Sequence, residues 1–201
     1  MAAGETIPNG MNLMNMRRLA WQALVLGVIT VVGASAAPAK ANHLAGQRAE
    51  YLKRSADQPV DWYPWGSEAF KLAKELNRPI LLDVGAVWCA WCNLMDRDSY
   101  TNAASAEYIN QHFVAVKVDF DSAGPLVAQL QRAQAILNLP AGLPLTSFIT
   151  PEGKLYYGAG YLPAVSQGGK PSFRETAEQA LKLFADKAKI EADSFQLELA
   201  K

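Results

Sequence analysis

The 201-residue chain has no excess of charge of either sign, because its 19 lysines and arginines are balanced by 19 acidic residues. Nucleic acid and anionic membrane surfaces attract proteins with a basic excess, so we expect neither to be the main partner. The sequence also has no long run of one charge and no repeat period. Its composition, half hydrophobic and 19% charged, is that of an ordinary globular protein.

Histidine and cysteine are also scarce, with two residues of each. His43 lies near the start of the predicted folded body and His112 just before a predicted strand, without the spacing of metal ligands. We therefore expect no resident metal ion and no organic cofactor. Both histidines are interpreted as ordinary surface or core residues.

The first 41 residues are typical of a secretory signal. A basic pair at 17–18 precedes an uncharged apolar stretch over 19–33, and small residues follow. Cleavage fits equally after Ala36 and after Ala41. The alternative is a retained anchor, because about 20 uncharged residues are enough to span a bilayer. In both cases we expect the body to lie outside the cytoplasm, either in the bacterial periplasm or tethered to the membrane facing it.

After removal of a signal, about 160 residues remain, which is one domain's worth and enough to bury a core without cross-links. We predict an extended lead-in over 42–60 and a polar, frayed tail over 189–201. Between them the order β-α-β followed by β-β-α predicts an α/β fold, a mixed sheet flanked by helices. The predicted strands cover 80–84, 113–118, 145–149 and 154–157, and the predicted helices cover 67–76, 89–97, 102–109, 125–137 and 172–184.

Three aromatic residues, Trp62, Tyr63 and Trp65, precede the first of these helices. They either cap an edge of the core or line a groove for substrate peptides.

The only two cysteines lie in one short stretch, VGAVWCAWCNLM, as Cys89 and Cys92. A thiol attacks a disulfide only as the thiolate, which the free N–H groups and dipole at a helix N-terminus stabilise. Because Cys89 ends a strand-to-helix turn, we expect it to be the exposed nucleophile. Cys92, one turn into the helix, is placed to resolve the mixed disulfide. Trp88 and Trp91 flank the thiols and are expected to shape access to them.

An acidic residue, Asp83, interrupts the apolar strand predicted over 80–84. A buried, ionised and unpaired carboxylate costs on the order of several kcal/mol, so desolvation is expected to raise its pKa. Such a group suits a general base that takes the proton from Cys92. The alternative is that Asp83 points outward at an edge of the sheet.

Pro144 directly precedes the strand predicted over 145–149. A proline that leads into a strand is a candidate for a cis peptide bond, although trans bonds are commoner.

Taken together, these residues resemble the thioredoxin superfamily. A strand aspartate, Trp-Cys-x-x-Cys, a proline before the penultimate strand, and a hairpin with a closing helix follow one another from about residue 45 to residue 185. The resemblance implies a thioredoxin fold over 61–188. It also implies roles for five residues: Asp83 as the buried acid, Trp88 as the aromatic before the nucleophile, Cys89 and Cys92 as the redox pair, and Pro144 as the cis-proline. We predict that the substrate-binding residues are Trp88, Trp91, Leu143 and Pro144.

Two branches of the superfamily are similar to this chain, each in different segments. Residues 59–65 and 142–145 are similar to the thioredoxin-like domain of the spermatogenesis-associated protein family, which typically has Cys-His-Trp-Cys before a large further domain. This chain has Ala90 in place of that histidine, so functions of those long proteins are not carried over. Residues 78–92 are similar to the periplasmic reductant domain of the thiol:disulfide interchange protein DsbD.

The residues and the resemblance predict an extracytoplasmic thiol:disulfide oxidoreductase that reduces or isomerises protein disulfides, with a redox-active Cys89–Cys92 disulfide and no other cofactor. Ala90-Trp91 lacks a histidine whose positive charge would make the disulfide more oxidising, which favours reduction over oxidation. The expected partners are disulfide-containing client proteins and a membrane thiol donor that supplies electrons.

Three other uses of the cysteines remain open. The pair could serve a dithiol oxidase, or form a structural disulfide, although so short a loop restrains the unfolded chain little. Two thiolates also suit Cu(I) or half of a zinc site, and Met95 lies three residues further on.

Overall fold

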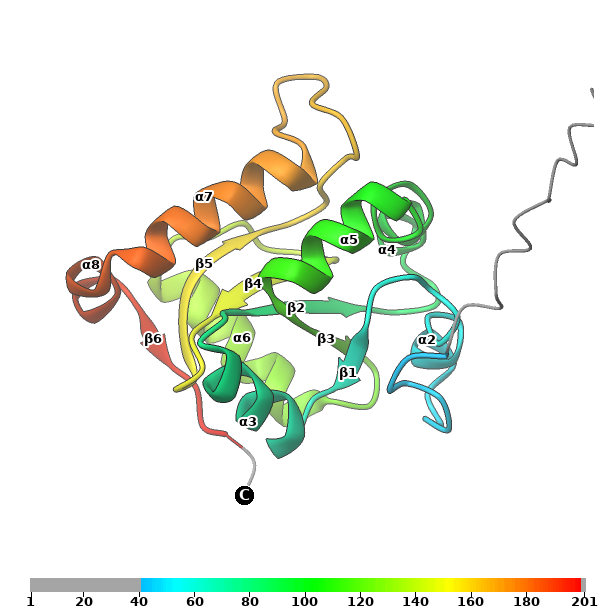
Figure 1. Ribbon diagram of the computed structural model, residues 1–201, viewed down its shortest axis with the longest axis horizontal. Helices are drawn as coiled ribbons and strands as arrows, with labels where there is room; N and C mark the ends of the chain where they lie inside the picture. The colour runs from blue at the N-terminus through cyan, green and yellow to red at the C-terminus, as the bar shows by residue number, and fades with distance from the viewer. Residues whose placement is uncertain (1–40, 200–201) are drawn as a thin grey trace, which may run out of the picture. The chain divides into compact units, whose positions relative to one another are not determined.

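The strand β2 (Ile80–Gly85) lies at the centre of the fold and is buried along its whole length, which explains its almost continuous run of apolar residues. It pairs in parallel with β3 (Val114–Asp119) and antiparallel with β4 (Leu145–Ile149). The computed structural model describes residues 41–199. Within them the sheet has the order β1-β3-β2-β4-β5-β6, where β1 is Trp62–Pro64, β5 is Lys154–Ala159 and β6 is Phe195–Gln196 (Figure 1). The predicted mixed sheet is confirmed.

Helices cover both faces of the sheet. Successive side chains of β2 point to opposite sides, and its apolar residues are buried on both of them. In Figure 1, α5 and α7 lie above the sheet and α3 and α6 lie below it. Ile80, Leu82 and Val84 pack on the side of α3 and α6, whereas Leu81 packs on the side of α5 and α7. These four helices are α3 (Ser67–Leu76), α5 (Ala103–His112), α6 (Gly124–Ile136) and α7 (Phe173–Ala185).

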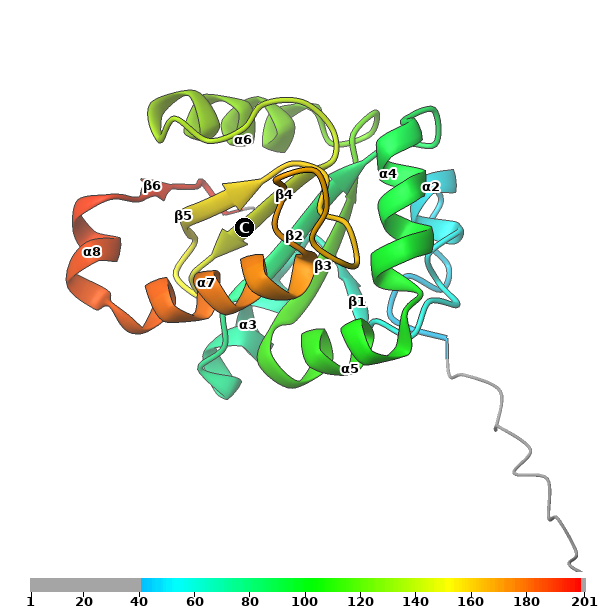
Figure 2. The ribbon, with the colours of Figure 1, turned by 90° about the horizontal axis from the view of Figure 1, so that it is seen from above.

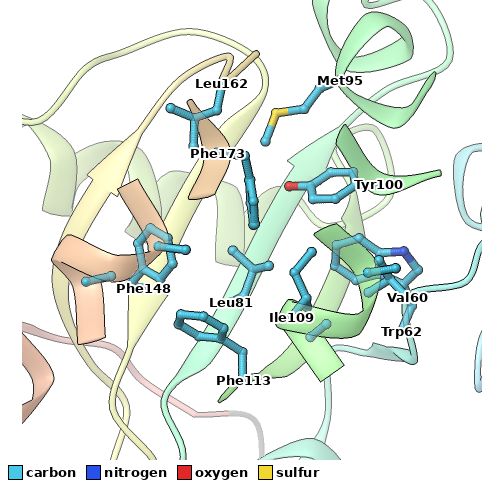
Figure 3. Packing of buried hydrophobic residues seen from close by; sticks show 14 of the residues in the cluster. Val60, Trp62, Leu81, Met95, Tyr100, Ile109, Phe113, Phe148, Leu162 and Phe173 are labelled. Carbon is cyan, nitrogen blue, oxygen red and sulfur yellow. The ribbon is translucent and has the colours of Figure 1, made fainter. Parts of the chain in front are cut away.

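The core on the α5 and α7 side is rich in aromatic residues. Figure 3 shows Phe148 of β4, Ile109 of α5 and Phe173 of α7 packed around Leu81. Burial of each such side chain contributes about 1.5–3 kcal/mol. The cysteines belong to this same core, so this face of the sheet positions the candidate site.

The segment over 42–60 is not an extended lead-in, as the sequence predicted. It contains the helix α2 (Glu50–Lys53) and it buries Leu44 and Tyr51 in the core. The Asn42 side-chain amide donates hydrogen bonds to backbone carbonyls within 55–60, the shortest at 2.8 Å. The apolar residues of this segment are too widely spaced for a regular period, so their burial shows only in the folded chain.

The predicted frayed tail is wrong as far as residue 199. The helix α8 (Lys187–Ala192) follows α7, and β6 pairs antiparallel with β5 (Figure 2). Leu197 and Ile190 are buried, which explains why this polar segment is ordered: two apolar side chains anchor it to the core.

Of the three aromatic residues before α3, Trp62 and Tyr63 belong to the core, whereas Trp65 is partly buried and lines a hollow of about 400 Å³. Trp62 is fully buried and Tyr63 nearly so. Trp62 donates a hydrogen bond from its indole N–H to Gln58 at 2.8 Å.

The predicted signal over 1–41 lies outside the described residues, apart from residue 41. Between residues 41 and 199, no helix is both long enough and apolar enough to cross a membrane.

Candidate functional site

The two cysteines lie where β2 ends and α4 (Ala90–Met95) begins, and they form a disulfide. Cys89 is the N-cap of α4, and its Sγ accepts a hydrogen bond from the backbone N–H of Cys92 at 3.1 Å. The predicted strand-to-helix turn is therefore confirmed. One free N–H group of this first turn, that of Cys92, therefore points at the sulfur of Cys89.

The two sulfurs differ in access. Cys92 is 1% exposed and Cys89 6% exposed, so the expected nucleophile is more enclosed than a surface residue. Cys89 nevertheless lines an apolar hollow of about 450 Å³, which we call the cysteine hollow, whereas Cys92 does not. Of the two cysteines, only Cys89 can therefore be reached from this hollow.

Trp88 and Trp91 form the rim of the cysteine hollow, with exposed fractions of 62% and 54%. The Trp88 indole N–H donates to Asp121 at 2.9 Å, and the ring packs edge-on against Phe120. Trp91 packs against Tyr161, with ring centroids 5.0 Å apart. Each tryptophan thus contacts a neighbour outside the cysteine turn.

The segment before β4 forms the opposite wall. Leu143 lines the cysteine hollow, and the Leu143–Pro144 peptide bond is cis, as the sequence suggested. Pro144 itself is buried and does not line the hollow. Of these two predicted substrate-binding residues, the structure therefore places only Leu143 at the surface of the hollow.

Asp83 is fully buried, so the alternative of an outward-facing edge residue is wrong. Its carboxylate accepts hydrogen bonds from the hydroxyls of Tyr51 at 2.8 Å and Tyr100 at 3.3 Å. The Lys117 ammonium lies 2.8 Å away, in the strand position of β3 that pairs with Asp83. The premise of an unpaired buried acid is also wrong, because these three donors satisfy the charge of the carboxylate.

Lys117 lies at the centre of this buried group. Its ammonium bridges Asp83 and Asp96, with the Asp96 oxygen 2.7 Å away. The rings of Tyr51, Trp62 and Tyr100 surround it, with centroids 4.5–4.9 Å from Nζ. Buried charges require such partners, and aromatic faces add further attraction to a cation. We call Asp83, Asp96, Lys117, Tyr51 and Tyr100 the buried ionic cluster.

The pKa values in the buried ionic cluster are shifted by burial and by the charges of neighbouring members. Burial disfavours the Lys117 ammonium, but Asp83 and Asp96 outweigh this and hold the pKa of Lys117 above its usual 10.5. Burial, together with the charge of Asp83, raises the pKa of Asp96 against the opposing effect of Lys117. Burial and the two carboxylates also raise the pKa of Tyr51 and of Tyr100 well above 10. Both tyrosines therefore remain hydrogen-bond donors at all physiological pH values.

The helix after the cysteines departs from the predicted span of 89–97. Helix α4 ends at Met95 and continues as a π-helical turn, η1 (Asp96–Tyr100). This turn places the Asp96 carboxylate against the Lys117 ammonium and the Tyr100 hydroxyl against the Asp83 carboxylate. Such π turns are often associated with functional sites.

Sequence reasoning missed Lys117, Asp96 and Tyr51 as members of the site. A signal for Lys117 was present, because a lysine inside the apolar strand over 113–118 is as unusual as the aspartate inside 80–84. Asp96 and Tyr51 gave no such signal, since both lie in polar sequence surroundings. Gly85 also helps to position Tyr51. A β-carbon at residue 85 would overlap the Tyr51 side chain, so the glycine leaves room for the tyrosine.

Met95 is fully buried beside Tyr100 and Leu162 (Figure 3). Its sulfur lies 3.9 Å from the Thr146 hydroxyl, so the structure shows it as a core residue. The described part of the chain contains no group of three or more His, Cys, Asp or Glu residues arranged to hold a metal ion.

Comparison with known proteins decides the family. The model of the Thioredox_DsbH family, described as a protein of unknown function, DUF255, matches residues 41–199. The chain belongs to this family. The match includes the segments over 42–60 and 189–199, which agrees with their packing on the Thioredox_DsbH domain.

Curated relatives of this Thioredox_DsbH chain are much longer proteins. Uncharacterized protein B0495.5 of Caenorhabditis elegans is 39% identical over 133 residues, which are 66% of this chain and 18% of the relative. Spermatogenesis-associated protein 20 of Rattus norvegicus is 37% identical over 128 residues, or 63% of this chain and 16% of the relative. The chain thus spans less than a fifth of these proteins, and the predicted resemblance to the spermatogenesis-associated family is confirmed.

Solved structures include a DsbH oxidoreductase that is 25% identical, with a TM-score of 0.47 over 62% of this chain and 85% of the other. The family match and the observed topology, rather than this likeness, show that the chain has the predicted thioredoxin fold. A mixed sheet flanked by helices carries the cysteine pair at the first turn of a helix.

Proposed function

We propose that the chain is a thiol:disulfide oxidoreductase that acts outside the cytoplasm and reduces or isomerises disulfides of client proteins. The placement of the Cys89–Cys92 disulfide carries the proposal: Cys89 opens on an apolar hollow, and Cys92 is enclosed behind it. A structural disulfide would not need this difference in access. A loop of so few residues would also stabilise the fold little.

Client capture starts from the reduced protein. The Cys89 thiolate attacks one sulfur of a client disulfide, the client S–S bond breaks, and the other client sulfur leaves as a thiolate that takes up a proton. The Cys92 N–H, which points at Cys89 Sγ, stabilises the attacking anion. The product is a mixed disulfide between Cys89 and the client.

Client release follows by attack of Cys92 on Cys89 Sγ. The Cys92 thiol loses its proton, the mixed disulfide breaks, and the second client thiol leaves as the Cys89–Cys92 disulfide forms. Two electrons have then passed from the protein to the client. Tyr51, Tyr100 and Lys117 donate hydrogen bonds to the Asp83 carboxylate and hold it in one orientation. We assign to Asp83 the removal of the Cys92 proton, with Lys117 fixing its orientation.

The redox potential tests the direction of this reaction. The protein is equilibrated with a series of glutathione buffers, and the fraction of Cys89–Cys92 disulfide is measured by thiol alkylation. We expect a potential in the range of thioredoxin and glutaredoxins, about −200 to −270 mV. A potential near that of DsbA, about −120 mV, would identify an oxidase instead.

Trapping tests the order of attack. Cys92→Ala is expected to accumulate mixed disulfides through Cys89, whereas Cys89→Ala accumulates none. In the intact dithiol, Asp83→Asn is expected to slow client release more than client capture in single-turnover measurements. Equal slowing of both steps would remove the role assigned to Asp83.

The extracytoplasmic location is proposed from the apolar segment over 19–33. Cleavage after Ala36 or Ala41 leaves Asn42, whose side chain closes the segment over 42–60, so either product keeps the folded body. Cell fractionation followed by N-terminal sequencing tests this. A reductant in that compartment depends on a membrane thiol donor, and loss of the donor would leave Cys89 and Cys92 oxidised in cells.

A further inference from the structure

A second hollow adjoins the cysteine hollow on the far side of Trp91. It has a volume of about 480 Å³ and lies between the segment over 140–143, the end of β5 and the loop over 160–171. Trp91, Gly142 and Leu143 line both hollows, so the two form one continuous surface. We call the second one the flanking hollow.

Lys170 is the single charged residue among those that line the flanking hollow. Its ammonium lies 5.6 Å from the ring centroid of Trp91 and 5.7 Å from that of Tyr161. Lys170 takes part in none of the ion pairs found among residues 41–199. The nearby Asp98, whose charge contributes to the raised pKa of Tyr161, is paired with Arg97 at 2.9 Å. Lys170 therefore offers an uncompensated positive charge over an aromatic floor.

The loop that carries Lys170 is closed by hydrogen bonds, although it projects from the body of the protein between β5 and α7 (Figure 1). The backbone groups of Gln167 and Lys170 bond to each other in both directions, at 2.9 and 3.2 Å. The Ser166 hydroxyl bonds to Glu175 in the first turn of α7 and also accepts from the backbone N–H of Ser172. These contacts hold Lys170 at the rim of the hollow.

The opposite side of the disulfide carries the opposite charge. There the Trp88 indole is bonded to the carboxylate of Asp121. A polypeptide that reacts at Cys89 thus meets a negative group beyond Trp88 and a positive group beyond Trp91. Such charge arrangements fix orientation and partner choice more than they raise affinity.

We infer that the flanking hollow binds the client chain beside its reacting cysteine, and that Lys170 selects clients with an acidic side chain there. This inference rests on the proposed function and specifies its substrate class. The selectivity comes from one exposed charge pair, so it is about two- to fivefold in rate. It decreases with added salt, because the pair is open to solvent.

The test uses the full chain with Cys92→Ala, so that capture by Cys89 is the only step. Peptides with one cysteine are prepared as mixed disulfides with 2-mercaptoethanol, which leaves as a thiolate that takes up a proton and carries no other charged group. They carry Glu, Gln or Lys at one position, either before or after the cysteine. Cys89 displaces mercaptoethanol in a thiol–disulfide exchange without net oxidation, and mass spectrometry follows the Cys89–peptide adduct.

We expect Glu peptides to react fastest and Lys peptides slowest, on one side of the cysteine only. Lys170→Gln should remove the preference and Lys170→Glu should reverse it. Lys182→Glu is the matched control, because it makes the same charge change at an exposed position of α7 outside both hollows. Equal effects of Lys170→Glu and Lys182→Glu, or equal rates for all peptides, would overturn the inference. Absence of an adduct with every peptide would instead contradict the proposed function itself.

Discussion

Lys117 is a fully buried cation whose charge is matched by two carboxylates and three aromatic rings. Taking such ions out of water costs several kcal/mol each, about as much as their mutual attraction returns. The arrangement therefore adds little net stability while it is intact. Its energetic effect appears when one member is removed and a buried charge is left without its partner.

Lys117→Met tests this at the residue scale. The substitution leaves Asp83 and Asp96 facing each other without a cation, so we expect a loss of about 3–5 kcal/mol in the free energy of unfolding. Guanidinium chloride unfolding at pH 7 measures it. The control is Lys71→Met, which removes an exposed lysine of α3 and is expected to change stability by less than about 0.5 kcal/mol. A loss as small as the control's would show that the cluster is solvated.

Tyr156 gives a pH-dependent prediction. Its hydroxyl donates to the Ala180 carbonyl at 3.2 Å, and burial raises its pKa above the usual 10. The unfolded chain loses this proton near pH 10 while the folded chain keeps it. The contribution of Tyr156 to stability is thus complete below pH 10 and is lost as the pH rises towards the folded pKa.

Tyr156→Phe is accordingly less stable than the wild type by about 0.5–1.5 kcal/mol at pH 8, because one buried hydrogen bond is lost. Above pH 10 the difference in the free energy of unfolding between wild type and variant should decrease by about 1.4 kcal/mol per pH unit. Urea unfolding at pH 8, 10 and 11 measures both. A stability difference that stays constant with pH would mean that Tyr156 has the same pKa in the folded and the unfolded chain.

At the scale of elements, α7 begins with a capping box that also anchors the loop of Lys170. The Ser172 hydroxyl accepts from the Glu175 N–H, and the Glu175 carboxylate accepts from the Ser172 N–H. Ser172→Ala is expected to cost about 1 kcal/mol and to speed hydrogen exchange in the first turn of α7. Ser67→Ala, at the start of α3 where no side-chain cap bond exists, should cost less. Equal losses would assign no capping role to Ser172.

The elements that the sequence predicted well share strong local signals. The hairpin of β4 and β5 has turn residues between apolar runs, and α6 has Pro125 in its first turn. The segment over 42–60 and the short α8 and β6 lack such signals, because helices of four to six residues and a two-residue strand form only through tertiary contacts.

The candidate site also has a part that can be predicted from the sequence and a part that cannot. Cys89, Cys92, Asp83, Trp88 and Trp91 were recognisable from residue type and spacing. The pairing of Asp83 with Lys117 depends on the register of two parallel strands, and that of Lys117 with Asp96 depends on a π-helical turn. Neither can be read from one sequence, because both are set by the packing of separate segments.

At the scale of the whole molecule, the folded domain begins before residue 61, the start predicted from the sequence. A chain that starts at residue 61, the predicted boundary, lacks Tyr51 and with it one donor to Asp83 and one ring beside Lys117. It also lacks the buried Leu44, Leu52 and Val60. Each such side chain contributes about 1.5–3 kcal/mol, and the sum is comparable to the total stability of a domain.

We therefore expect a chain over 42–201 to unfold cooperatively and one over 61–201 to show no cooperative transition. Near-ultraviolet circular dichroism during denaturant titration distinguishes the two. A cooperative transition of the shorter chain at a similar midpoint would show that the segment over 42–60 is dispensable.

The two short outer strands have a consequence for behaviour at high concentration. Exposed sheet edges are templates for pairing between molecules, and proteins blunt them with very short strands and with proline. Here β1 has three residues and ends in Pro64, and β6 has two residues laid along β5. The edge strand on each side of the sheet is therefore short, although β6 covers only Lys154 and Leu155 of β5. At high concentration, such short edges leave little strand available for pairing between molecules.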